Sequence, residues 1–212
     1  MAKSKLIILE GMECCGKSTQ INLLKEYFAN HQKDFLLIKE PGQTKLGQKL
    51  REILLFNDEP IDPITQSFMF NACRSDIYKK HVIPNLGKDI FLIQDRAWTT
   101  TIVYQGFAFQ QDLKRIEDAC YLAVQDIMPD LIIFLDIEMD KYEKILKERL
   151  LNRSNEKVNH FDEKEFSFYQ RAYDGYQYLA NKFKDKWFKV DALQPIEAIH
   201  QQIVQEIEKR FN

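Results

Sequence analysis

Paired cysteines are missing from this chain of 212 residues. Its four cysteines are Cys14, Cys15, Cys73 and Cys120, and they do not show the paired spacing of a zinc-binding motif. Two of them are adjacent, inside a loop pattern described below. This usage is typical of a protein whose thiols stay reduced, so we expect a cytoplasmic location.

Long hydrophobic runs are missing too. The first apolar run, residues 6–9, is far too short for a signal peptide or a membrane span, and no later run is long enough either. We therefore expect a soluble protein that is not secreted and has no membrane partner.

The chain also lacks an excess of charge of one sign. Its 30 Lys and Arg residues face 32 Asp and Glu residues, for a net charge of -2. Such a protein does not attract polyanions as a whole, which argues against a general nucleic-acid or membrane-surface binder. Internal repeats, low-complexity segments and linkers are absent as well, so we expect a single domain over residues 1–212.

Short apolar runs alternate with longer amphipathic patterns. The runs predict strands at 6–9, 35–38, 90–93, 131–135 and 187–190. The longer patterns predict helices at 19–30, 45–55, 64–83, 113–127, 141–151, 163–183 and 195–211. This alternation predicts an α/β fold in three layers, with a parallel sheet covered by helices on both faces. Four of the runs stop at or next to a charged residue, so we expect an active edge at the carboxyl ends of the strands.

The stretch after the first predicted strand has the spacing of a phosphate-binding loop. Its residues are Gly11, Met12, Glu13, Cys14, Cys15, Gly16, Lys17, Ser18 and Thr19. Glycines let successive N–H groups turn inward around an anion, and the following helix adds its positive end. We expect Lys17 to reach the terminal phosphates of a nucleotide and Ser18 to ligate Mg²⁺. The alternative, an ordinary strand-to-helix turn, leaves these two residues unexplained.

A carboxylate and a guanidinium follow the third predicted strand. Asp95 can hold or orient Mg²⁺ opposite a phosphate loop, while Arg96 neutralises phosphoryl oxygens; a surface ion pair is the alternative. The second predicted strand ends at Glu40, Pro41 and Gly42, where a turn could present its backbone to a substrate. Such turns are common, so this one alone does not identify a site.

An aromatic ring and a guanidinium share one face of the helix predicted at 64–83. Phe70 and Arg74 are four residues apart, so both point the same way and could hold a flat, carbonyl-bearing ring. Residues 68–70 could equally belong to the core, and spacing alone leaves both interpretations open.

Two further polar clusters allow two interpretations each. Hydroxyls and an amide follow Arg96, at Thr99, Thr100, Thr101, Tyr104 and Gln105. Taken alone, such a cluster more often caps a helix than recognises a ligand. Arg149 and Arg153 flank the polar stretch 152–159. They are either a solvated basic helix end or part of a lid, approximately 149–162, that closes over the transferred phosphoryl group.

Taken together and in order, these motifs resemble the thymidylate kinase family. The matching positions are residues 10–19, Glu40, Pro41, Gly42, Thr44, Leu46, Gly47, Arg51, Phe70, Arg74, Asp95, Arg96, Tyr104, Gln105, Gly106, Pro129, Asp130, Leu131, Leu135, Asp136, Gly175 and Tyr176. The resemblance implies a P-loop NTPase fold with a five-stranded parallel sheet and a lid. It also implies that ATP and Mg²⁺ convert thymidine monophosphate (dTMP) to the diphosphate, a step in dTTP synthesis, in an enzyme that is commonly a homodimer.

The resemblance also assigns an acceptor site. Its residues are Glu13, Glu40, Pro41, Arg51, Phe70, Arg74, Arg96, Thr100, Thr101, Tyr104 and Gln105. Phe70 would stack on thymine, Arg74 would donate to its ring carbonyl, and Tyr104 would disfavour a ribose 2′-hydroxyl. Arg51 and Arg96 match residues that clamp the acceptor phosphate, so they supply positioning and charge neutralisation for phosphoryl transfer.

The loop departs from the family pattern in two ways. Cys14 and Cys15 stand where the family usually has small residues, so we expect strained or altered geometry at Cys14. The loop also lacks the arginine of one subgroup, so an arginine at the γ-phosphate would come from Arg149 or Arg153. With these two, Lys17, Asp95 and Arg96 complete the expected catalytic set.

Two other classes of protein are alternatives. A kinase for another nucleotide or nucleoside would share the fold and differ in what Phe70, Arg74 and Tyr104 recognise. A regulatory switch that uses hydrolysis as a timer is the second. The chain has no Asn-Lys-X-Asp stretch of the kind that reads guanine, and its arginines suit an acceptor site better.

Overall fold

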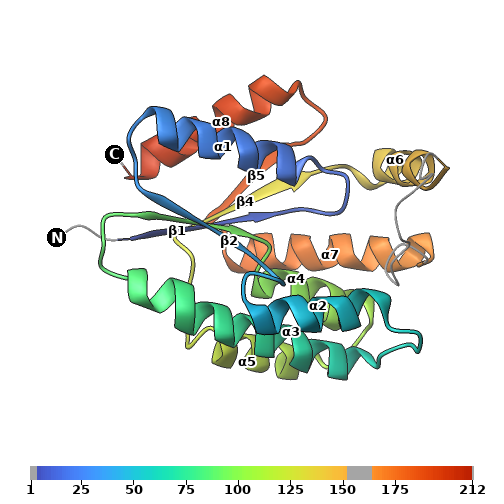
Figure 1. The fold of residues 1–212 in the computed structure, drawn as a ribbon. Coiled ribbons are helices and arrows are strands. Elements are labelled where there is room, and N and C mark those ends of the chain that lie inside the picture. Colours follow the sequence, from blue (N-terminus) through green and yellow to red (C-terminus); the bar gives the residue numbers. More distant parts are fainter. Residues whose placement is uncertain (1–3, 152–163, 212) are drawn as a thin grey trace.

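The computed structural model describes residues 4–151 and 164–211, without the side chains of residues 149–151 (Figure 1). The side chain of Arg149, the whole of Arg153 and most of the expected lid therefore lie outside the described residues. Within them, no helix has the length and apolar character needed to cross a membrane.

A five-stranded parallel sheet forms the centre of the fold, as predicted. Its strands are β1 (Lys5–Glu10), β2 (Phe35–Lys39), β3 (Phe91–Asp95), β4 (Leu131–Asp136) and β5 (Trp187–Asp191), in the order β2-β3-β1-β4-β5. β1 is central and pairs with β3, where Leu9 lies opposite Asp95, and with β4, where Ile7 lies opposite Leu131. Its residues Leu6, Ile7, Ile8 and Leu9 are buried, as the apolar run predicts for a strand covered on both faces.

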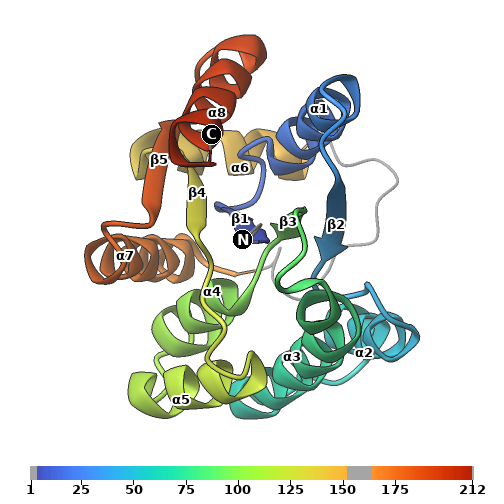
Figure 2. The same cartoon turned by 90° about the vertical axis from the view of Figure 1, so that its left-hand side faces the viewer.

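Helices cover both faces of the sheet (Figures 1 and 2). One layer contains α1 (Lys17–Asn30) and α8 (Ile196–Phe211). The other contains α2 (Lys45–Phe56), α3 (Pro63–Ile77), α4 (Trp98–Thr101), α5 (Leu113–Ala123) and α7 (Phe166–Lys182). α6 (Met139–Leu151) lies beyond the carboxyl ends of the strands, at the right of Figure 1. The three-layer α/β prediction is thus confirmed, and the loops after β1, β2 and β3 share the edge expected to be active.

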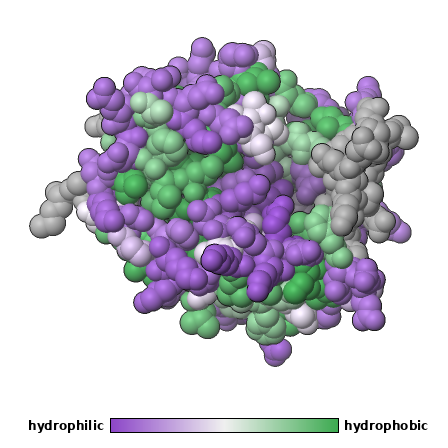
Figure 3. Space-filling view, in the orientation of Figure 1, coloured by the Kyte–Doolittle hydropathy of each residue, from purple (hydrophilic) through white to green (hydrophobic). Residues whose placement is uncertain are grey.

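The front edge of the sheet in Figure 1 is strand β2. Its residues Phe35, Leu36 and Leu37 are only half-buried, and Figure 3 shows a hydrophobic area between the two helix layers there. An edge strand pairs on one side only, which explains why its apolar side chains are less covered than those of β1.

Two helical predictions extended too far toward the C-terminus. The helix predicted at 64–83 ends at Ile77 and continues as the π-helical turn η1 (Tyr78–Val82) and the 3-10 turn η2 (Ile83–Asn85), where Pro84 offers no N–H. The helix predicted at 113–127 ends at Ala123, because Gln125 and Asp126 have positive φ angles.

A helical segment was also missed. It comprises α4 and the π-helix η3 (Ile102–Ala108). Its β-branched side chains, including Thr99, Ile102 and Val103, weaken the helical signal in the sequence.

Candidate active site

Two glycines shape the loop between β1 and α1. A Cβ at Gly11 would lie 2.5 Å from Cys15 Sγ and 2.7 Å from the Leu135 carbonyl oxygen, so no side chain fits there. Gly16 has a left-handed backbone, with φ +84°, where it precedes α1. Cys14 is also left-handed, with φ +63°, although it carries a Cβ. The strain expected at Cys14 is therefore present in the structure.

The Lys17 ammonium is folded back onto this loop. Its Nζ donates to the carbonyl oxygens of Gly11 and Met12, each at 2.8 Å, and to Cys15 Sγ at 3.4 Å. Burial lowers the pKa of Lys17, and the nearby Arg96 guanidinium lowers it further. An anion in the loop would reverse that effect, so the ammonium is suited to bind phosphate oxygens. Ser18 next to it is exposed in the first turn of α1.

Arg96 connects the end of β3 to the same loop. It has φ +62°, its backbone N–H donates to the Leu9 carbonyl oxygen at 3.2 Å, and its Nη1 donates to the Gly11 carbonyl oxygen at 3.4 Å. The Gly11 carbonyl therefore accepts from both Lys17 and Arg96. Although burial alone would lower it, Tyr104 and other acidic neighbours raise the pKa of Arg96 well above its ordinary value.

A buried carboxylate joins the end of β1 to the segment after Arg96 and to α7. The sequence indicated this residue only as part of the loop motif. Glu10 is fully buried, and its Oε1 accepts hydrogen bonds from the Ala97 backbone N–H at 3.1 Å, from the Thr99 hydroxyl and from the Thr100 hydroxyl at 3.0 Å. The Tyr176 hydroxyl donates to its Oε2 at 3.1 Å. The threonine hydroxyls bind Glu10, so they do not cap a helix as the alternative interpretation proposed.

A pocket of about 140 Å³ opens beside the loop. All eleven predicted acceptor residues line it: Glu13, Glu40, Pro41, Arg51, Phe70, Arg74, Arg96, Thr100, Thr101, Tyr104 and Gln105. Leu55 and Ala97 line it as well and were not predicted. Phe70 is half-buried in its wall, whereas Phe68 is 65 % exposed. Residues 68–70 therefore do not form core, which removes one of the two interpretations left open by the spacing.

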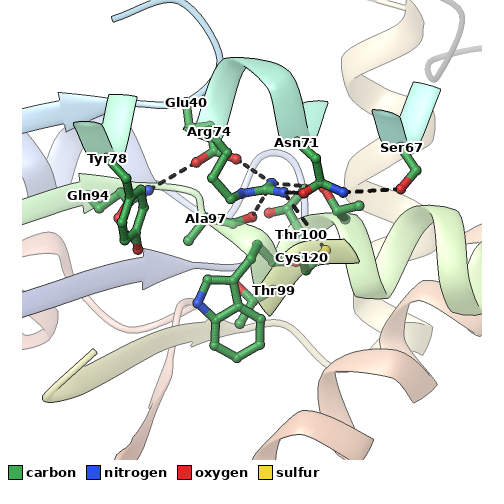
Figure 4. Close-up of polar contacts among 12 residues, drawn as sticks. Glu40, Ser67, Asn71, Arg74, Tyr78, Gln94, Ala97, Thr99, Thr100 and Cys120 are labelled. Atoms are coloured by element: carbon green, nitrogen blue, oxygen red, sulfur yellow. Dashed lines mark hydrogen bonds and ion pairs between the residues drawn. The ribbon is translucent and has the colours of Figure 1, made fainter. Parts of the chain in front are cut away.

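A network of polar side chains surrounds Arg74 at the back of this pocket (Figure 4). Arg74 is buried; its Nη2 pairs with Glu40 and donates to Thr101 Oγ1 at 2.9 Å, and its Nη1 donates to Asn71 Oδ1. Gln94 Nε2 in turn donates to Glu40 Oε2 at 3.0 Å. Arg74 is thus held rigidly, with most of its donors already satisfied by the protein. Asn71 and Gln94 were missed because neither stands in a motif.

The donor set also fits a magnesium ion carried by a nucleotide. Among the described residues, no group of three or more His, Cys, Asp or Glu side chains could hold a metal alone. Mg²⁺ bound with phosphates needs only one or two protein oxygens. The Ser18 hydroxyl is exposed at the start of α1, and the half-buried Asp95 carboxylate stands at the end of β3, close enough to influence Lys17 electrostatically.

Comparisons with known proteins agree with this geometry. A sequence model of the family described as thymidylate kinase matches residues 9–203. Three similar curated proteins carry the name thymidylate kinase. That of Caldanaerobacter subterraneus subsp. tengcongensis is 29 % identical over 98 % of this chain and 96 % of its own length. That of Thermosipho africanus is 32 % identical over 97 % and 98 %, and that of Bacillus cereus strain Q1 is 29 % identical over 99 % of each.

Proposed function

The chain belongs to the thymidylate kinase family, and we propose, on that premise, how its residues transfer the γ-phosphoryl group of ATP to dTMP to give dTDP. As a member of this family it is a phosphotransferase that binds nucleotides. The roles of its individual residues form the proposal.

The loop between β1 and α1 binds the phosphates of ATP. Its backbone N–H groups surround the anion, and the positive end of α1 adds to the attraction. Lys17 exchanges the carbonyl oxygens of Gly11 and Met12 for phosphate oxygens. Ser18 and Asp95 would hold Mg²⁺, which neutralises charge on the phosphates when bound. Arg149 and Arg153 remain candidates for closure over the transferred group.

The pocket beside the loop binds dTMP. The half-buried ring of Phe70 stacks on the base, and the rigidly held Arg74 together with Gln105 faces its polar edge. Arg51 and Arg96 clamp the acceptor phosphate. The Thr100 hydroxyl already donates to Glu10, so toward a substrate it can only accept a hydrogen bond.

One observation carries this proposal: Arg96 lines the acceptor pocket and also contacts the phosphate loop through Gly11. Acceptor and donor phosphates would therefore meet at one wall that carries two cations, Arg96 and Lys17. Phosphoryl transfer depends on such positioning and charge neutralisation, and it needs no covalent intermediate.

A panel of acceptors tests the assignment. With ATP, we expect the highest kcat/KM for dTMP, lower values for dUMP, UMP, dCMP and dGMP, and no turnover of thymidine. The same assay without an acceptor measures background hydrolysis. Equal turnover of UMP and dTMP would contradict the assignment, and substantial hydrolysis without an acceptor would favour the regulatory switch.

We also propose a cytoplasmic homodimer. The four free cysteines favour a reducing compartment. Phe68 on α3 and Leu122 on α5 are 65 % and 79 % exposed, and a second copy could cover such apolar side chains. Sedimentation equilibrium of the wild type and of Phe68→Ser tests this, and a monomeric wild type at micromolar concentration would contradict it.

A further inference from the structure

Gln105 carries a buried acceptor in the wall of the nucleotide pocket. The residue lies in η3, is 1 % exposed and lines the pocket. Its Oε1 is buried and has no hydrogen-bond partner among the described residues. Leaving such an atom unpaired is costly, so a ligand that brings a donor N–H to it gains affinity.

The direction of this amide is set by a residue outside the pocket. An amide side chain has an oxygen and a nitrogen of nearly equal size, so Gln105 alone could present either atom. The Ile61 carbonyl oxygen can only accept, and Gln66 Nε2 donates to it at 2.8 Å. Gln66 must therefore turn its Oε1 toward Gln105, whose Nε2 donates to it at 3.0 Å. The oxygen of Gln105 is therefore left as an acceptor without a partner, next to the second hydrogen of Nε2.

The anchor of this pair is itself rigid. Gln66 is 7 % exposed near the start of α3, and its backbone N–H donates to the Asp62 carbonyl oxygen at 2.9 Å. Asp62 also caps the helix, where its Oδ1 accepts from the backbone N–H groups of Ile64 and Thr65. The Ile61 carbonyl therefore precedes a capped helix start, which limits reorientation of the Gln66 amide.

We propose that Gln66 is a positioning residue that sets the base preference of the pocket. By holding the Gln105 oxygen toward the base, it favours a pyrimidine whose N3 carries a hydrogen and whose C4 carries an oxo group. It disfavours a 4-amino pyrimidine, whose N3 is itself an acceptor. This inference rests on the proposed function, because it requires the pocket to hold the acceptor base.

Two substitutions at one position test the inference. Gln66→Met offers only a weak thioether acceptor, so the Gln105 amide is free to turn over. Gln66→Glu, protonated at this buried site, donates its O–H to the Ile61 carbonyl oxygen and keeps its other oxygen as the acceptor for Gln105 Nε2, so the direction of the amide is preserved. The measurement is kcat/KM for dTMP and for 5-methyl-dCMP, which keeps the sugar and the 5-methyl group but reverses the hydrogen bonding at N3 and C4. We expect the dTMP preference to fall about tenfold in Gln66→Met, the scale of one hydrogen bond, and to stay within about twofold in Gln66→Glu.

Gln20→Met is the matched control for loss of a buried glutamine. Gln20 is 2 % exposed, and its Nε2 donates to the Ile196 carbonyl oxygen; both residues lie in the helix layer on the other face of the sheet from Gln66. Its substrate ratio should equal that of the wild type. Gln66→Ala repeats the test if Gln66→Met does not fold.

The possible outcomes distinguish a failure of the positioning role of Gln66 from a failure of the proposed substrate. An unchanged ratio in Gln66→Met, an equal fall of kcat/KM for both substrates, or equal losses of selectivity in the Met and Glu variants would each overturn the positioning role. A wild type that uses dTMP and 5-methyl-dCMP equally well would instead refute the proposed substrate, and the inference with it.

Discussion

Tyr176→Phe removes one buried hydroxyl and should show how strongly the phosphate loop depends on Glu10. Tyr176 is fully buried, and its hydroxyl lies 3.1 Å from Glu10 Oε2 and 3.3 Å from the Gly11 carbonyl oxygen. Phenylalanine fills the same space apart from the hydroxyl. The substitution therefore removes a hydrogen bond to a buried carboxylate and leaves the packing of α7 nearly unchanged.

The size of the effect follows from the donors that remain. A hydrogen bond to a charged group contributes about 1.5–3 kcal/mol to stability. Glu10 keeps the backbone N–H of Ala97 and the hydroxyls of Thr99 and Thr100, so we expect the lower part of that range, about 1.5–2 kcal/mol. For a chain of this length, each kcal/mol lowers Tm by about 2–4 °C, which gives a fall of about 3–8 °C.

Tyr142→Phe provides the matched control. Tyr142 is also fully buried, but its hydroxyl has no hydrogen-bond partner among the described residues. Removing it should change the free energy of unfolding by less than about 0.5 kcal/mol or stabilise the protein slightly. Urea unfolding followed by circular dichroism measures both variants under identical conditions. Equal losses in the two variants, or no loss in Tyr176→Phe, would refute the assigned role of Glu10.

The remaining predictions concern the two nucleotide sites. Lys17→Ala should lower kcat by about a hundredfold or more and change dTMP affinity little, because the charge of Lys17 counts most in the transition state. Burial lowers the pKa of Lys17 below 10.5 and bound phosphates raise it, so ATP affinity, measured calorimetrically, should weaken as pH rises through that lowered value. Phe70→Ala should weaken dTMP binding by about 1–3 kcal/mol. A thiol reagent at neutral pH should label exposed Cys14 and not Cys73 or Cys120, because burial raises the pKa of each of these two thiols to about 11. ATP should protect Cys14, because this residue lies in the phosphate loop.

Each of these predictions has a result that contradicts it. Undiminished turnover in the Lys17 variant would remove this residue from the mechanism, and a pH dependence that persists in the same variant would point to another group. A Phe70 variant that loses only folding stability would return that ring to a packing role. Labelling at Cys73 or Cys120, detected by peptide mass spectrometry, would contradict the thiol prediction.

The sheet could be predicted because its strands are short apolar runs that end at charged residues. Runs such as 6–9 and 131–135 bury both faces, so their composition alone distinguishes them from amphipathic helices. The segment 98–108 was missed for the opposite reason. Its β-branched residues favour strands locally, and packing against α3, α5 and α7 holds it in helical form.

The candidate site likewise contains residues that the sequence predicts and residues that it does not. The phosphate loop was predictable from spacing, because a phosphate cradle needs glycines, a lysine and a hydroxyl at adjacent positions. The spacing of Phe70 and Arg74 placed them on one helix face but could not show whether that face meets the core or a pocket. Glu10 binds Ala97 and Gln66 binds Gln105, both distant in the sequence, and such contacts cannot be predicted from a local pattern.

The Gly11 carbonyl oxygen shows why the two substrate sites depend on one peptide. Lys17 from the donor side and Arg96 from the acceptor side both donate to it, and Arg96 is 85 positions away along the chain. A side chain at Gly11 would collide with Cys15 and Leu135, so this peptide is packed closely against them and has no room to shift toward them. Lys17 and Arg96 are therefore held beside the same peptide before either nucleotide binds, and in the proposed mechanism Lys17 then exchanges this carbonyl for phosphate oxygens. Because preorganised charges need no rearrangement during transfer, the close packing that excludes a Cβ at Gly11 also serves the reaction.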